Sequence, residues 1–162
     1  MNKKIENAFN KQINAELYSS YLYLAMSAWL ESKNFKGMAH WMRAQAAEEQ
    51  AHALKFYDFI HDRQGRVKLA AIDEPPAEWI SPAAVFKDAY EHECKVSALI
   101  HGLVDLAAAE KDHAASSFLQ WFVNEQVEEE AHASEIAEKL NMIGDSRGPI
   151  FMIDSELGKR GN

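Results

Sequence analysis

Two glutamates in this sequence are each followed three residues later by a histidine: Glu49 by His52, and Glu129 by His132. In a helix this spacing places both side chains on one face, one turn apart. Carboxylate and imidazole groups suit iron or manganese better than soft metals. One such pair is weak evidence for a metal site. Two pairs on separate helices predict that facing helices share bound metal ions.

Four glutamates interrupt apolar stripes that should face the core of a helical bundle. Around Glu16, for example, Phe9, Ile13 and Tyr23 recur at helical spacing and therefore lie on the same face. Each of the four lies near the middle of its helical segment, so all can meet at one level. The four are Glu16, Glu49, Glu93 and Glu129.

Solvated glutamates are the competing interpretation, because acidic helical proteins carry many of them. One acid on each helix at matching depth argues against that interpretation. Four unpaired carboxylates in a core would be very costly, so they must either be protonated or bind cations. Two divalent ions would balance the charge of four carboxylates.

The segments that carry these acids read as long helices, because the sequence holds only seven glycines and four prolines. Ser81 can cap a helix that begins at Pro82, and Gly144 can end the fourth helix. We expect an all-α fold. Its helices are predicted at about 3–32, 36–64, 82–109, 112–143 and, as a short fifth helix, 149–157.

The lengths of the connections predict the topology. Short links join the first helix to the second and the third to the fourth, which makes each pair antiparallel neighbours. The link 65–80 contains Pro75-Pro76 and no clear periodicity. Helices of roughly 28 residues are about 42 Å long, and an extended link of this size reaches at most roughly 50 Å. We therefore predict a single domain, residues 1–162, built as a four-helix bundle with one long crossover.

Composition excludes several other classes of protein. A formal charge of −8 argues against a nucleic-acid-binding surface. The single cysteine, Cys94, excludes an intrachain disulfide and a cysteine-rich zinc or iron–sulfur site. No stretch approaches ~18 consecutive apolar residues, and no apolar run follows the first six residues. We expect no membrane span, no signal peptide and a cytoplasmic location.

Several stretches of the sequence match one family closely. The most specific is residues 118–130 (FLQWFVNEQVEEE). The others are residues 14–20 (NAELYSS), 47–52 (AEEQAH), 90–93 (YEHE) and 150–154 (IFMID). In these stretches the chain resembles the bacterial non-haem ferritins. The resemblance implies a ferritin-like bundle that assembles as a hollow shell of 24 copies, with ferric mineral inside.

The resemblance also implies a ferroxidase site that oxidises Fe(II) to Fe(III) with dioxygen or peroxide. Glu16, Glu49 and His52 would hold the first of two iron ions in each chain. Glu49 would bridge to the second ion, which Glu93 and Glu129 would also hold.

The same resemblance assigns roles around this pair. Gln126 would orient oxygen or a bound water, and Tyr23 would hydrogen-bond at the site and can lend an electron. A third iron ion is a further candidate, at a site toward the inner cavity that shares Glu129. The other acids of that site would be Glu48, Glu125 and Glu128.

One departure from the family concerns His132, because a second Glu-x-x-His is usual in bacterioferritins and rubrerythrins instead. The chain carries both His132 and Gln126, so either can complete the shell of the second iron. We expect Gln126 to be the nearer group and His132, an additional candidate ligand, to lie at the edge of the site. Gln50 stands where bacterioferritins have a haem-binding methionine, so no haem is expected.

The remaining candidates are given structural roles. Trp121 is expected to pack. Cys94 should point away from the metals, because it follows Glu93 by about 100° around the helix. The histidines without a partner pattern are expected at the surface: His40, His61, His92, His101 and His113.

Two other functional classes compete with iron storage. A rubrerythrin-type peroxidase has a similar site but normally carries a four-cysteine module, which one cysteine cannot supply. A DNA-protecting mini-ferritin places its metal between subunits, and a purely structural bundle would leave the buried acids unexplained. A large hollow particle that fills with iron would distinguish storage from these alternatives.

Overall fold

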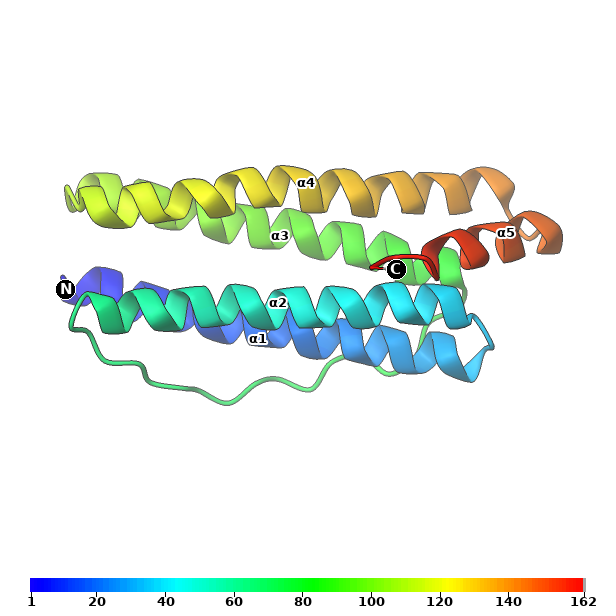
Figure 1. The fold of residues 1–162 in the computed structure, drawn as a ribbon, viewed down its shortest axis with the longest axis horizontal. Helices are drawn as coiled ribbons and strands as arrows, with labels where there is room; N and C mark the ends of the chain where they lie inside the picture. The colour runs from blue at the N-terminus through cyan, green and yellow to red at the C-terminus, as the bar shows by residue number, and fades with distance from the viewer. Residues whose placement is uncertain (162) are drawn as a thin grey trace.

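The computed structural model describes residues 1–161, and Figure 1 shows their arrangement. Four long helices lie side by side and a short fifth helix follows at one end (Figure 1). Among the described residues, no helix has the length and apolar character needed to cross a membrane. The helices are α1 (Lys3–Ser32), α2 (Lys36–Asp62), α3 (Pro82–Ala109), α4 (His113–Ile143) and α5 (Arg147–Leu157).

Most helix ends agree with the sequence prediction. The Ser81 hydroxyl accepts a hydrogen bond from the backbone N–H of Ala84 (3.1 Å), as expected for a cap. Gly144, at the end of α4, has a φ of +56°, which glycine adopts without strain. Helix α2 is two residues shorter than predicted, because Gln64 adopts a φ of +56° and the N–H of Gly65 donates back to the Ile60 carbonyl (2.8 Å).

The other two differences lie at helix N-termini. Asp112 caps α4 from outside rather than belonging to it, because its carboxylate accepts from the N–H of Ala115 (3.0 Å). Helix α5 begins at Arg147, two residues before the predicted start, with Ser146 at the N-cap position.

The long connection between α2 and α3 runs the length of the bundle, so these two helices are parallel (Figure 1). Asparagine side chains of α1 hold it in place. Asn10 donates to the Arg66 carbonyl (3.0 Å), and Asn14 donates to the Ala71 carbonyl (3.0 Å). The predicted crossover topology is therefore present.

The buried apolar side chains form two clusters, one toward each end of the bundle. The first includes Met26 and Met42, and the second includes Phe9, Phe56 and Phe122. On every long helix, the residues between the two clusters include one buried glutamate. The bundle therefore carries a polar layer at mid-height, enclosed above and below by apolar side chains.

Candidate metal centre

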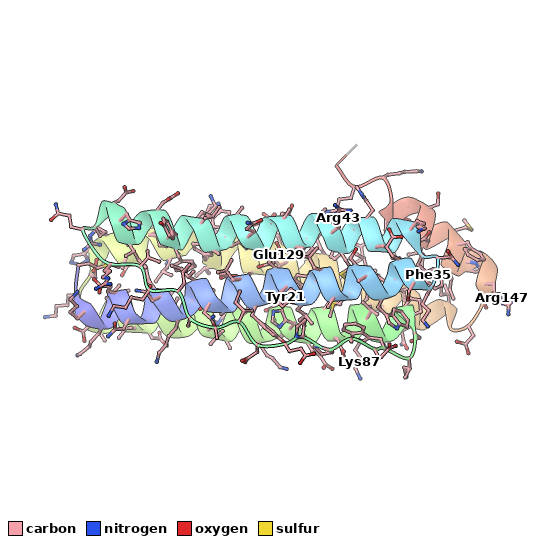
Figure 2. All side chains as sticks on the ribbon, turned by 90° about the horizontal axis from the view of Figure 1, so that it is seen from below. Tyr21, Phe35, Arg43, Lys87, Glu129 and Arg147 are labelled. Carbon is pink, nitrogen blue, oxygen red and sulfur yellow. The ribbon has the colours of Figure 1, made fainter. Side chains whose placement is uncertain are left out.

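Each long helix contributes one glutamate to the polar layer. Glu16, Glu49 and Glu93 are each 1% exposed, and Glu129 is 5% exposed. Glu129 lies midway along the bundle in Figure 2. His52, one turn after Glu49 on α2, is also buried. The apolar stripes of the four helices thus bring their polar interruptions together at one level, as the sequence predicts.

Candidate ligand atoms form three groups here: His52 and Glu129 join Glu125 in one group at the edge of the layer, and the two groups within the layer share Glu49. One group consists of Glu16, Glu49 and His52, and the other of Glu49, Glu93 and Glu129. Within each group the candidate ligand atoms lie within 4.8 Å of one another, close enough to surround one metal ion. These are the two ligand sets that the family resemblance implies, although metal binding by them stays a prediction.

Burial raises the pKa of each of these four carboxyl groups, which favours the protonated forms. It raises the pKa of Glu16 to about 8, and the charge of Glu49 adds to the effect. Burial also raises the pKa of Glu129 to about 7, with repulsion from Glu93 as the second cause. The pKa of Glu49 is raised well above its ordinary value by burial and then by Glu93 and Glu129. Cations that entered this layer would displace protons and relieve this repulsion.

Two buried carboxylate oxygens indicate that the layer is suited to metal ions. Among the described residues, the buried Oε2 atoms of Glu16 and Glu49 have no hydrogen-bond partner. Glu16 and Glu49 are both members of the first ligand group, with His52. Buried acceptors without donors are costly, and cations bound there would satisfy them.

Neutral donors orient the other oxygens. Gln12 donates to Oε1 of Glu16 (2.8 Å), and Gln45 donates to both Glu49 (3.2 Å) and Glu129 (2.5 Å). Neither glutamine was predicted from the sequence as part of the site. Each stands four residues before a core glutamate, and therefore on the same helical face, which is a signal that would have found them.

Comparison with known proteins agrees with this arrangement. The sequence model of a family described as a ferritin-like domain matches residues 6–143. The chain belongs to the ferritin family. It is 49% identical over 160 residues to a bacterial non-heme ferritin of Bacteroides fragilis, covering 99% of both sequences.

Two further comparisons extend this result. The ferritin is 39% identical to a probable bacterial non-heme ferritin-like protein of Haemophilus influenzae, covering 98% of this chain and 96% of that protein. An open pore ferritin of Archaeoglobus fulgidus matches its structure with a TM-score of 0.98 at 51% identity, covering 99% of this chain and 98% of the other. The predicted fold, a ferritin bundle with a short fifth helix, is confirmed.

In this ferritin the Tyr23 hydroxyl donates a hydrogen bond to Glu93. Burial raises the pKa of Tyr23 well above its ordinary value, so the phenol is neutral. Gln126 donates to the other oxygen of Glu93 (3.1 Å) and to the Ser97 hydroxyl (3.2 Å). Tyr23 and Gln126 therefore both contact the second ligand group through the carboxylate of Glu93.

Gln126 and His132 differ in position as the sequence analysis expected. Gln126 is buried against Glu93, whereas the His132 side chain is exposed in an open cavity beside the polar layer. Coordination by either group stays a prediction.

The remaining predicted acids gather in this cavity, which has a volume of about 420 Å³. Glu125 is half-buried there, with Oε1 3.9 Å from Nε2 of His52, and Glu48 and Glu128 are exposed. Together they surround the outward side of Glu129. One partner was not predicted: Arg160, from the segment after α5, donates to Glu48 (2.6 Å).

One histidine differs from the expected surface placement. His92 is half-buried, with Nε2 2.7 Å from the Ser19 hydroxyl. Burial lowers its pKa to about 4, and the charge of Lys95 adds to this effect. Pro76 of the long connection lines the same pocket, so the crossover covers this part of α3.

The other side chains lie close to where they were expected. His40, His61, His101 and His113 are exposed. Trp121 packs edge-on against His52, with ring centroids 5.3 Å apart. Cys94 is half-buried and belongs to neither ligand group.

Proposed function

We propose that this ferritin stores iron and is a ferroxidase: it oxidises Fe(II) to Fe(III) at the paired ligand groups within each chain. The observation that carries the proposal is that Glu49 belongs to both buried groups, with one oxygen that has no hydrogen-bond partner. A carboxylate in that position can bridge two metal ions. Family membership supports the storage role.

The ligand set suits two Fe(II) ions as substrate. Glu16 and His52 would complete the shell of the first ion, and Glu93 and Glu129 that of the second. Oxygen and nitrogen donors of this kind favour iron over soft metals. The four carboxylates match two divalent ions in charge. Each pair of Fe(II) ions that enters would therefore displace the protons from these buried carboxyl groups.

The electron balance requires two iron ions. Each Fe(II) loses one electron, and one dioxygen molecule takes up both electrons and two protons to give hydrogen peroxide. Peroxide is a second oxidant that the same pair can reduce. The chain excludes bulk water with the two apolar clusters and fixes the carboxylates with glutamine and tyrosine donors, so that little rearrangement is needed.

The product would move from the pair toward the inner cavity of the shell, through the acids around Glu129. Glu48, Glu125 and Glu128 line the open cavity on that side and would hold a third ion briefly before mineral forms. We propose that 24 chains close into a shell around the mineral and that no haem is bound. The cytoplasmic location expected from the sequence stays a prediction.

The proposal is tested by adding Fe(II) to the purified protein in air. Ferric absorbance should develop far faster than in protein-free buffer, and the iron should elute with a large particle on size exclusion. Iron that precipitates at the protein-free rate, or elutes apart from the protein, would contradict the proposal. A small particle that reduces peroxide without retaining iron would instead favour a rubrerythrin-type peroxidase.

A further inference from the structure

Arg160 lies at the mouth of the acidic cavity, although it comes from the segment after α5. Its Nη2 atom donates to Oε2 of Glu48 (2.6 Å), and its Nη1 atom donates to Oε1 of Gln45 (2.9 Å) and to the Trp41 carbonyl (3.2 Å). The guanidinium also lies over the Trp41 ring, 4.5 Å from its centroid. A guanidinium held by an aromatic face and three acceptors is a placed cation rather than a mobile surface side chain.

The packing of α5 against α2 positions Arg160 at the cavity. The carboxylate of Asp154 accepts from the backbone N–H of Met38 (2.9 Å), in the first turn of α2, where Phe35 supplies no side-chain cap. Gly37 permits close approach of the helices, because a Cβ atom there would lie 1.7 Å from the Asp154 carbonyl oxygen. Farther along, the Arg160 carbonyl contacts Nε2 of His40 (2.8 Å).

Gln45 connects Arg160 to the inner pair of ligand groups. Its carbonyl oxygen accepts from Arg160, which leaves its amide nitrogen turned inward to donate to Glu49 and Glu129. Gln45 is 1% exposed, so this amide has no water to replace a lost partner. The guanidinium therefore fixes which end of the amide faces the carboxylates.

We propose that Arg160 is a tethered counter-ion that occupies the outer acidic site, meaning Glu48, Glu125 and Glu128 around the cavity, until a metal cation displaces it from Glu48. The inference rests on the proposed function, because it concerns the passage of iron from the two buried ligand groups into the acidic cavity. Arg160 acts as a positioning residue: it competes for a carboxylate of the outer site and, through Gln45, couples that site to Glu49 and Glu129.

The charges around the guanidinium favour such a competition. Glu125, Glu128 and Glu129 line the same cavity as Glu48, so the site attracts cations. Glu48 is substantially exposed, so its bond to Arg160 is weak enough to exchange. A divalent ion carries more charge than one guanidinium, so it can replace Arg160 as the partner of the Glu48 carboxylate while α5 stays folded.

The test is calorimetric titration of the assembled, metal-free protein with Zn(II) at neutral pH, which avoids oxidation. The variants are Arg160→Gln, which removes the competing charge, and Arg160→Lys, which keeps it. Lys159→Gln is the matched control, since it removes the same charge from the adjacent residue, whose side chain is exposed and forms no ion pair within residues 1–161.

We expect two tight Zn(II) sites and one weaker site per chain in the unmodified protein. Arg160→Gln should tighten the weaker site by about threefold to tenfold, the range expected for removing one nearby, partly screened charge. Lys159→Gln should leave that affinity within about twofold of the unmodified protein. Arg160→Lys keeps the charge but loses the stacked, forked guanidinium, so it should tighten the weaker site by less than Arg160→Gln does.

Two results would overturn the inference while leaving the proposed function intact: a weaker site that is unchanged in Arg160→Gln, or one that binds Zn(II) less tightly. The second result would mean that Arg160 merely supports the fold. Absence of the two tight sites in the unmodified protein would instead contradict the proposed function. Gel filtration and thermal unfolding of each variant confirm that the assembly compared is the same.

Discussion

Nδ1 of His52 lies 3.4 Å from Oε2 of Glu49, one helical turn away, and both side chains are buried. That glutamate oxygen has no hydrogen-bond partner among the described residues. The pair therefore presents an imidazole nitrogen and a free carboxylate oxygen side by side. Glu49 also belongs to the second ligand group, so it links the two candidate ion positions.

Replacing Glu49 by alanine should slow aerobic Fe(II) oxidation by roughly 100-fold, because the change removes a ligand from both ions. The assembly should persist, because loss of one buried acid relieves repulsion in the metal-free bundle. Stopped-flow absorbance measures the rate, and gel filtration measures the assembly. Glu91→Ala, on the exposed face of α3, is the control and should keep the normal rate. Unchanged kinetics in Glu49→Ala would refute the bridging role.

The buried acids should make the metal-free protein less stable as pH rises. The pKa of Glu16 is about 8 in the folded chain, against an ordinary value of 4.5. The stability from such a raised pKa is fully present below the unfolded value and is lost as pH rises through the folded value. The free energy of unfolding should therefore fall between pH 4.5 and about pH 8.

Glu16→Gln isolates this effect, because the amide cannot ionise. Its free energy of unfolding should exceed that of the unmodified protein by on the order of 3 kcal/mol at about pH 8, and by much less at about pH 5. Guanidinium unfolding of the metal-free proteins at both pH values gives the comparison. The same difference at both pH values would show that Glu16 does not titrate in this range.

Glu129 and His132 should contribute very unequally to the second metal ion. Glu129→Ala should nearly abolish binding at that position, because the carboxylate belongs to the buried group. His132→Ala should weaken binding or slow oxidation by no more than about threefold, a small fraction of the loss expected for a ligand. Zn(II) calorimetry and oxidation rates measure the two effects. A loss in His132→Ala as large as in Glu129→Ala would reverse the ordering and make the site resemble that of bacterioferritins.

Two glycines provide a matched test of how α5 is docked. In Gly37→Ala the new methyl group would meet the Asp154 carbonyl 1.7 Å away, whereas a Cβ at Gly102 has nothing within 4 Å. Gly37→Ala should lower the free energy of unfolding by about 2 kcal/mol or detach α5. Gly102→Ala should raise it by roughly 0.5–1 kcal/mol, since alanine favours a helix interior. Scanning calorimetry distinguishes the two; equal shifts would contradict the tight docking.

The convergence of the four core glutamates was predictable from the sequence because they break a strong apolar pattern. A glutamate among apolar neighbours at helical spacing, as at Glu16 and Glu93, indicates both the helix face and the chemistry. The long helices also fix the depth of each acid, so convergence at one level follows from the topology. Gln12 and Gln45 carry the same positional signal, but a neutral amide can be buried with ordinary hydrogen bonds and therefore does not by itself indicate a metal site.

Other features depend on contacts that periodicity does not encode. The bond of Arg160 to Glu48 requires α5 to dock where Gly37 leaves room, and residues 158–161 (GKRG) have no periodic pattern that would reveal this approach. His92 is half-buried because the crossover lies over it, and the path of an irregular segment has no periodic signature. The exact ends of α2 and α4 depended likewise on local capping, at Gln64 and Asp112.

The most direct test of the central claim is anomalous scattering at the iron edge from crystals soaked anaerobically in Fe(II). We predict two strong peaks within each bundle, one between Glu16, Glu49 and His52, and the other between Glu49, Glu93 and Glu129. Glu49 should be the only residue that contacts both peaks. Absence of iron from the bundle, or a single peak that Glu49 does not contact, would contradict the account.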